Sequence, residues 1–125
     1  MSAPSPQLQT LKAEFFRALA HPIRIRLLEV LVASRECSVQ DLGRTLSLHQ
    51  PIVSQQLARL RSSGIVVTRK SGTATRYAVA DPQVKELLHV ARQILNRRLV
   101  GVRSLLRELA HDVSSPLRNR SRSAD

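Results

Sequence analysis

Two short helical segments joined by a tight turn are the feature that most restricts how this 125-residue chain can fold. The segment CSVQDLGRTLSL predicts the first helix, with Ser38 as N-cap and Asp41 where a capping box places its acidic partner. The stretch SLHQPIVSQQLARLRSSGIV predicts the second, because its apolar residues fall at helical spacing. Between them, Ser47–His49 leave room only for a turn. Such a pair is typical of a helix-turn-helix.

The flanking sequence predicts two earlier helices, a β-hairpin and a long final helix. A helical period begins at Leu8, and AHPIRIRLLEVLVA predicts a helix starting at Pro22 with His21 as its cap. IVVTR and RYAVA are strand-like runs around KSGTAT, where Gly72 can adopt a positive φ. Asp81 and the proline after it cap the last helix. The predicted fold class is mainly α with a small β-hairpin, a winged helix-turn-helix that dimerises through its C-terminal helix.

The chain is predicted to be one domain between two tails. Residues 1–7 contain two prolines and small polar residues, and are predicted to be a disordered N-terminal arm. The winged helix-turn-helix domain covers residues 8–113 and includes a dimerisation helix at about 82–113. Residues 114–125 are predicted to be a basic disordered tail.

Apolar residues recur every seven positions along the final helix. The repeat could belong to an intramolecular core or to a dimer seam. Three short helices and a two-stranded wing are too small to cover it, which favours the dimer. Whether the helix is continuous or broken near Gly101 stays open. The predicted dimerisation residues are Leu88, Leu95, Val102 and Leu109.

Charge and composition point to double-stranded DNA as the partner. The chain has 20 Lys and Arg against 9 Asp and Glu, a formal net charge of +11, and such a surplus favours a polyanion. Aromatic residues make up 2% of the chain, too few for a platform on which single strands stack. No apolar run is long enough for a membrane span. We therefore expect a cytoplasmic protein with no membrane partner.

One face of the second helix of the pair is rich in hydrogen-bonding groups and carries no acidic residue. Gln55, Arg59 and Ser62 project nearly opposite its apolar stripe, with Pro51 and Ser54 beside them. Gln can bond adenine and Arg guanine in bidentate fashion in the major groove. This face is therefore predicted to read base edges.

The hairpin is predicted to position the protein on the DNA backbone. Arg69, Lys70 and Arg76 can meet phosphates or enter a minor groove, and Thr73 offers a hydroxyl donor. Taken alone, a basic hairpin is as often an ordinary solvated turn as a DNA-binding element.

The chain resembles the ArsR/SmtB winged-helix repressors of bacteria over roughly residues 11–95. FFRALAHPIRIRLLEVL is similar to the family's opening signature, SVQDLGRTLSLHQPIVSQQLARLRSSGIV to its helix-turn-helix block, and RKSGTATRYAVAD to its wing. The resemblance implies a homodimer that represses its own or a neighbouring operon. It also implies DNA contacts at Gln50, Pro51, Ser54 and Gln55.

The metal ligands usual in that family are absent from its motif positions. The Cys-x-Cys pattern would fall on Ser38 and Gln40, and the final-helix pattern starting at Asp81 meets Gln83, Ile94 and Arg97. No cofactor is therefore predicted. His89 and His111 could join a non-standard nickel or zinc site if the helix bends or a second copy lies near; histidines without a ligand role are the simpler interpretation.

The predicted function is sequence-specific binding of double-stranded DNA by a homodimeric transcriptional repressor at an inverted-repeat operator, under control of an unidentified signal. The alternative is a basic architectural protein that binds DNA with little sequence preference. An enzyme is not expected, because no nucleophile–base pair and no Gly-rich phosphate loop can be recognised.

Overall fold

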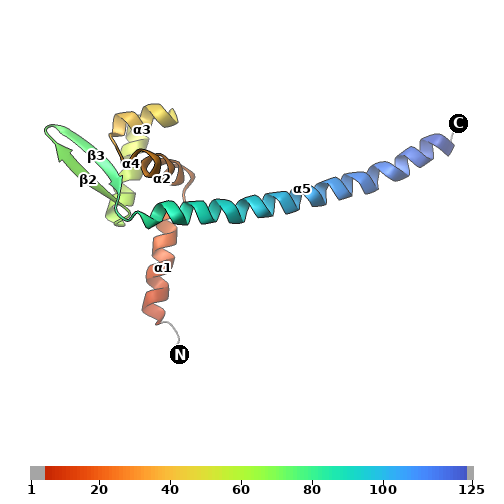
Figure 1. Ribbon diagram of the computed structural model, residues 1–125, viewed down its shortest axis with the longest axis horizontal. Helices are drawn as coiled ribbons and strands as arrows, with labels where there is room; N and C mark the ends of the chain where they lie inside the picture. The colour runs from red at the N-terminus through yellow and green to blue at the C-terminus, as the bar shows by residue number, and fades with distance from the viewer. Residues whose placement is uncertain (1–4, 124–125) are drawn as a thin grey trace. The chain divides into compact units, whose positions relative to one another are not determined.

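The computed structural model describes the backbone of residues 5–123 and the side chains of residues 5–112. The chain divides into two units, one ending at Glu86 and the other beginning at Leu87. Figure 1 labels every element except the short strand β1; the elements are α1 (Pro6–Leu19), α2 (Pro22–Ser34), β1 (Glu36–Cys37), α3 (Val39–Leu46), α4 (Gln50–Ser62), β2 (Val66–Ser71), β3 (Ala74–Val79) and α5 (Gln83–Ser123).

The core of the first unit is built from aliphatic side chains of α2, α3, α4 and β2. In the described part of the chain, no polar or charged residue is buried. The apolar stripe expected on α4 is confirmed, because its three members have no exposed surface. The largest fully buried side chains are Leu27, Leu28, Leu31, Leu42, Val53, Leu57, Leu60 and Val66.

Side-chain caps begin α2 and α3 where the sequence predicts them. His21 Nδ1 accepts a hydrogen bond from the Ile23 amide at 3.1 Å, and Ser38 Oγ accepts one from the Asp41 amide at 3.1 Å. The Asp41 carboxylate bonds Arg44. The hydrogen bond to the Ser38 hydroxyl is therefore the part of the predicted capping box that forms. The Asp41 carboxylate instead makes an ion pair with Arg44 on the surface of α3.

Ser38→Ala should lower the free energy of unfolding by about 1 kcal/mol, because it leaves an amide of the first turn of α3 without its cap. Urea unfolding followed by circular dichroism measures the loss. Ser34→Ala, at the exposed end of α2, is the matched control and should change stability by less than about 0.5 kcal/mol. Equal losses in the two variants would show that the Ser38 cap contributes nothing.

Backbone and side-chain contacts together fix the turn between α3 and α4. Ser47 adopts φ 54°, and the Leu48 amide donates to the Gly43 carbonyl at 2.9 Å. A Cβ at Gly43 would lie 3.1 Å from the Leu48 oxygen, tighter than most such contacts. From α2, Arg26 Nη2 donates to the Leu46 carbonyl at 2.9 Å. The turn thereby sets the angle at which α4 leaves α3.

The wing is a three-stranded antiparallel sheet in the order β1-β3-β2. The hairpin was predicted, and Gly72 takes φ 64° in its turn. The third strand was not predicted: Glu36 pairs with Ala78 and Cys37 with Tyr77. A strand of two residues carries no periodicity, so only the fold reveals it.

Both terminal helices extend beyond their predicted limits. α1 begins at Pro6, inside the predicted arm, because Ser5 Oγ accepts from the Leu8 amide and proline suits the first helical position; residues 1–4 lie outside the described residues. α5 begins at Gln83, whose amide donates to Asp81 Oδ1 at 2.9 Å. Its backbone continues through Gly101 and through the predicted tail as far as Ser123; residues 124–125 are not described.

Within the described residues, no helix is long and apolar enough to cross a membrane.

Candidate nucleic-acid interface

The exposed face of α4 is rich in hydrogen-bonding side chains and free of acidic residues. Val53, Leu57 and Leu60 are fully buried on one side of the helix, which leaves the other side to solvent. α4 contains no acidic residue, and its last turn is basic. Every α4 residue predicted to contact DNA is exposed: Gln50, Pro51, Ser54, Gln55 and Arg59.

The hydrogen-bonding groups of this face differ in how available they are. Ser62 Oγ donates to the Arg59 carbonyl at 3.0 Å, so its donor is already engaged. The described part of the chain provides no hydrogen-bond partner for the side chain of Gln55. Because an exposed amide is satisfied by water, it can exchange that water for a base edge.

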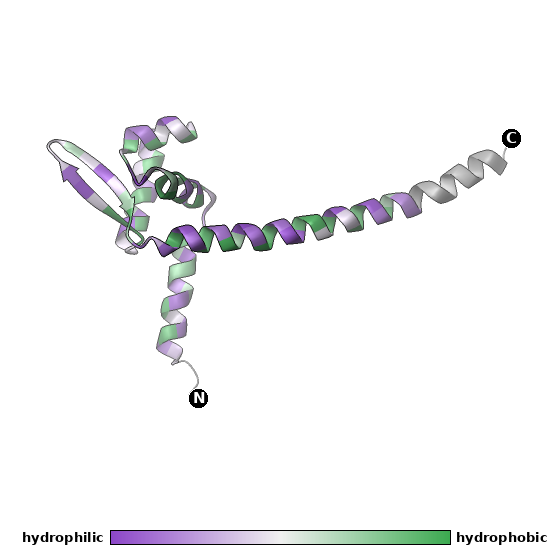
Figure 2. Cartoon of the chain, viewed as in Figure 1, coloured by the Kyte–Doolittle hydropathy of each residue, from purple (hydrophilic) through white to green (hydrophobic). Residues whose placement is uncertain are grey.

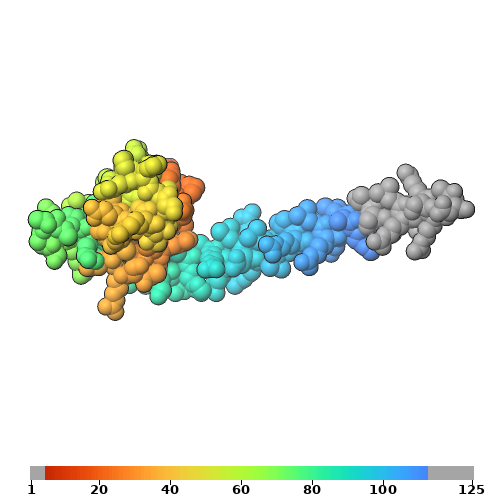
Figure 3. Space-filling model, turned by 90° about the horizontal axis from the view of Figure 1, so that it is seen from above, coloured from red at the N-terminus to blue at the C-terminus, as the bar shows by residue number. Residues whose placement is uncertain are grey.

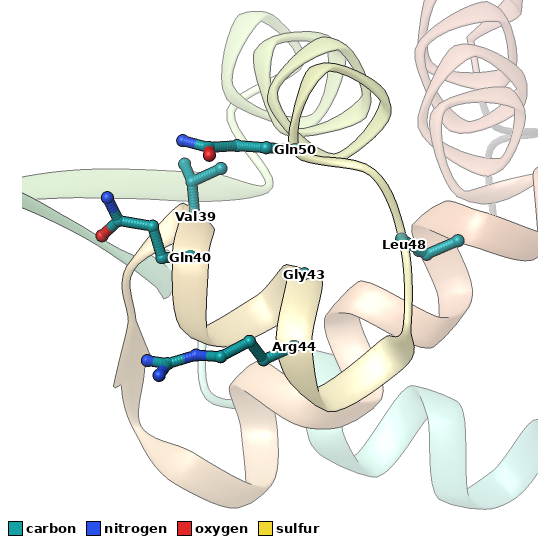
Figure 4. A pocket seen from close by; sticks show the side chains of 6 residues that line it. All are labelled: Val39, Gln40, Gly43, Arg44, Leu48 and Gln50. Atoms are coloured by element: carbon teal, nitrogen blue, oxygen red, sulfur yellow. The ribbon is translucent and has the colours of Figure 1, made fainter.

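Two residues of α3 extend this face and were missed by sequence reasoning. Figure 4 shows the side chains of Gln40, Arg44 and Gln50 projecting to the same side of the helix pair, with Leu48 directed away from them. They line an open hollow between α3 and the first turn of α4. The exposure of Gln40 and Arg44 follows from the apolar spacing of α3, but that they adjoin Gln50 follows only from the turn.

The first turn of α4 adds backbone polarity to the hollow. His49 is the N-cap residue, and its side chain makes no cap hydrogen bond. The N-terminal end of a helix carries a partial positive charge, and amides there bind phosphate readily. Arg44 also lines the hollow, but the Asp41 carboxylate that it bonds offsets part of its charge.

The structure divides the predicted wing contacts between the two faces of the hairpin. Arg69 and Arg76 are direct partners across β2 and β3, so they lie on one face; Lys70 is opposite Thr75, one position along, and lies on the other. Thr73 is in the turn between the strands. Of the predicted wing contacts, the two arginines are therefore the ones that share a face of the hairpin.

Two carboxylates lie next to the basic groups. Glu36 is 3.9 Å from Arg69 Nη1 and 3.9 Å from Arg76 Nε. On α3, the hydrogen bond from Arg44, together with that from Ser38, lowers the pKa of Asp41, and the charge of Arg76 also lowers it. Both carboxylates reduce the net positive charge of this surface.

The predicted dimerisation residues lie on α5. Leu95, Val102 and Leu109 are each at least half exposed, whereas Leu88 is partly buried. Figure 2 shows apolar and polar residues alternating along this helix. In the part of the unit from Leu87 onward that the structure describes, there is no helix or strand other than α5 against which these side chains could pack (Figure 3).

The candidate metal ligands do not converge in one chain. His89 and His111 are on the uninterrupted helix α5, where their separation corresponds to about 33 Å along the axis. Across the described residues, no three or more His, Cys, Asp or Glu side chains come together in a group that could hold a metal ion. Cys37 is buried in the short strand β1.

Known proteins are similar to this chain in both sequence and fold. The family model described as "Bacterial regulatory protein, arsR family" matches residues 21–68, from the cap of α2 into β2. Rv0081, an uncharacterized HTH-type transcriptional regulator of Mycobacterium tuberculosis, is 46% identical over 106 residues, or 84% of this chain and 92% of that protein. A probable mercury resistance operon repressor of Streptomyces lividans is 39% identical over 80 residues, 64% of this chain and 63% of that protein.

Solved structures confirm the winged helix-turn-helix fold. The crystal structure of Rv0081 matches with a TM-score of 0.68 and 48% identity, over 78% of this chain and 96% of the other. A homodimeric winged helix-turn-helix DNA-binding domain from Mycobacterium bovis, described as that of a possible ArsR-family transcriptional regulator, matches with a TM-score of 0.68 and 25% identity, over 79% and 94% of the two chains.

Proposed function

We propose that this chain, which belongs to the ArsR family of bacterial regulatory proteins, is a homodimeric repressor that binds an inverted-repeat operator in double-stranded DNA. The observation that carries the proposal is the division of α4 into a fully buried aliphatic side and an exposed, acid-free amide and hydroxyl side. A helix whose outer face contacts only solvent would normally carry both acidic and basic residues on that face. This one instead presents the groups that the major groove accepts.

The proposed contacts divide into base reading and backbone positioning. In the major groove, Gln55 and Arg59 offer bidentate hydrogen bonds and Ser54 a hydroxyl group. Arg44 and the first turn of α4 would bind one phosphate at the hollow. The wing would bind phosphates on either side of the site. The full proposed set is Gln40, Arg44, Gln50, Pro51, Ser54, Gln55, Arg59, Arg69, Lys70, Thr73 and Arg76.

A second copy of the chain is the proposed partner of the apolar residues on α5. These residues lack a partner within their own unit, and a similar domain of 25% identity is homodimeric. Two-fold symmetry would place the two copies of α4 about 34–36 Å apart, one turn of DNA.

The test is a selection of genomic fragments by the purified protein, followed by titration of the best fragment and of random duplex at physiological salt. A repressor should prefer its operator by about 10³-fold or more. An architectural protein would bind both duplexes with one affinity that falls steeply with salt, and that result would refute the proposal. Repeating the titration with nickel, zinc, oxidant and chelator would identify the signal. Because its target is DNA, we infer a cytoplasmic location.

A further inference from the structure

Five charged residues of alternating sign connect the wing to α3. We call them the charge row. Glu36 is at its centre: one carboxylate oxygen is 3.9 Å from Arg69 and the other is 3.9 Å from Arg76. The charge of Arg76 also contributes to lowering the pKa of Asp41, the carboxylate that bonds Arg44. The charge row is Arg69, Glu36, Arg76, Asp41 and Arg44.

The strand register explains why Glu36 reaches both arginines. Arg69 and Arg76 are directly opposite in the antiparallel pair, and like charges so placed repel each other. Glu36 pairs with Ala78, two residues from Arg76 on the same strand, so it lies on the same face of the sheet. Its carboxylate therefore offsets a repulsion that the hairpin would otherwise retain.

These ion pairs are too exposed to contribute much to folding. The side chain of Arg69 is 74% exposed, that of Arg76 45% and that of Glu36 36%, and exposed pairs add little stability. Their main consequence concerns the charge that remains for a phosphate. With Glu36 between them, two arginines present a net charge of one.

We propose that Glu36 restrains binding to DNA of arbitrary sequence by partly neutralising the two wing arginines. A phosphate that approaches either arginine is repelled by the carboxylate. Non-specific affinity comes almost entirely from charge contacts of this kind, so the repulsion lowers it directly. The inference rests on the proposed function, because it takes the wing to be a DNA-backbone contact.

The experiment measures binding of the 125-residue chain to a scrambled duplex of about three helical turns at several salt concentrations. Glu36→Gln should bind about two- to fivefold more tightly than wild type, and the slope of log K against log salt should be steeper by about one. Glu29→Gln is the matched control. It makes the same change in net charge at an exposed position of α2, for which the described residues provide no ion pair within 4 Å.

A variant that lacks the two wing arginines tests whether Glu36 acts on DNA binding through them. When Arg69 and Arg76 are both replaced by Gln, adding Glu36→Gln should change affinity no more than Glu29→Gln does. The inference is overturned if Glu36→Gln binds no more tightly than Glu29→Gln, or if its gain persists without the two arginines. Failure of wild type to bind the duplex even at low salt would instead refute the proposed function. Thermal melts confirm that each variant is folded.

Discussion

Replacing Leu95 or Val102 with Asp should convert the dimer to monomers and reduce operator affinity by at least about 100-fold. Each of these side chains is about half exposed in the single chain, 53% and 51%, and would be covered by the second copy. Full burial of such a side chain is worth about 1.5–3 kcal/mol. Because the dimer has two-fold symmetry, this free energy is lost once in each copy. Each new carboxylate would also be buried without a partner. A monomer would then hold only one half-site.

Sedimentation velocity measures the change in mass, and titration of the selected operator fragment measures the affinity. Gln93→Asp is the matched control, because Gln93 is exposed and lies nearly opposite Leu95 around the same helix. It should remain dimeric. If the Leu95 and Val102 variants also sediment as dimers, the seam is elsewhere and the proposed interface is wrong.

Gln55→Ala should lower operator affinity by about 1–3 kcal/mol and relax the choice of base at one position in each half-site. The reason is geometric: the Gln55 side chain is exposed, lies opposite the buried stripe of α4 and has no partner within the described structure. Gln93→Ala, which removes an amide from α5, should have no such effect.

Arg76→Ala provides the contrast for Gln55→Ala. Since Arg76 is assigned to phosphate, its loss should weaken operator and random duplex alike and make the salt slope shallower by about one. The two variants are compared by titration on both duplexes. An equal loss from Gln55→Ala on operator and random DNA would contradict a base-reading role.

Local sequence signals determine most of the fold. The buried stripe of α4, the caps at His21 and Ser38 and the positive φ at Gly72 were all predicted, because each depends on neighbours within a few residues. The start of α1 at Pro6 was not predicted, because the two prolines and the small polar residues of positions 1–7 were interpreted as a disordered arm.

The remaining features depend on residues distant in sequence. β1 exists because Glu36 and Cys37 pair with a strand about forty residues later, and no window of sequence shows that pairing. The same pairing brings Glu36 to the wing arginines. In the same way, Arg44 joins Gln50 at one hollow only once the turn between α3 and α4 has formed.

Chemical protection of guanine N7 on the selected operator fragment tests most directly that α4 reads base edges from the major groove. N7 faces that groove. Binding of the wild-type dimer should protect guanines in two clusters, centred about 10–10.5 bp apart, and Gln55→Ala should reduce protection within each cluster. Protection spread evenly along the fragment, or no protection of N7 under conditions where the protein is fully bound, would contradict this mode of recognition.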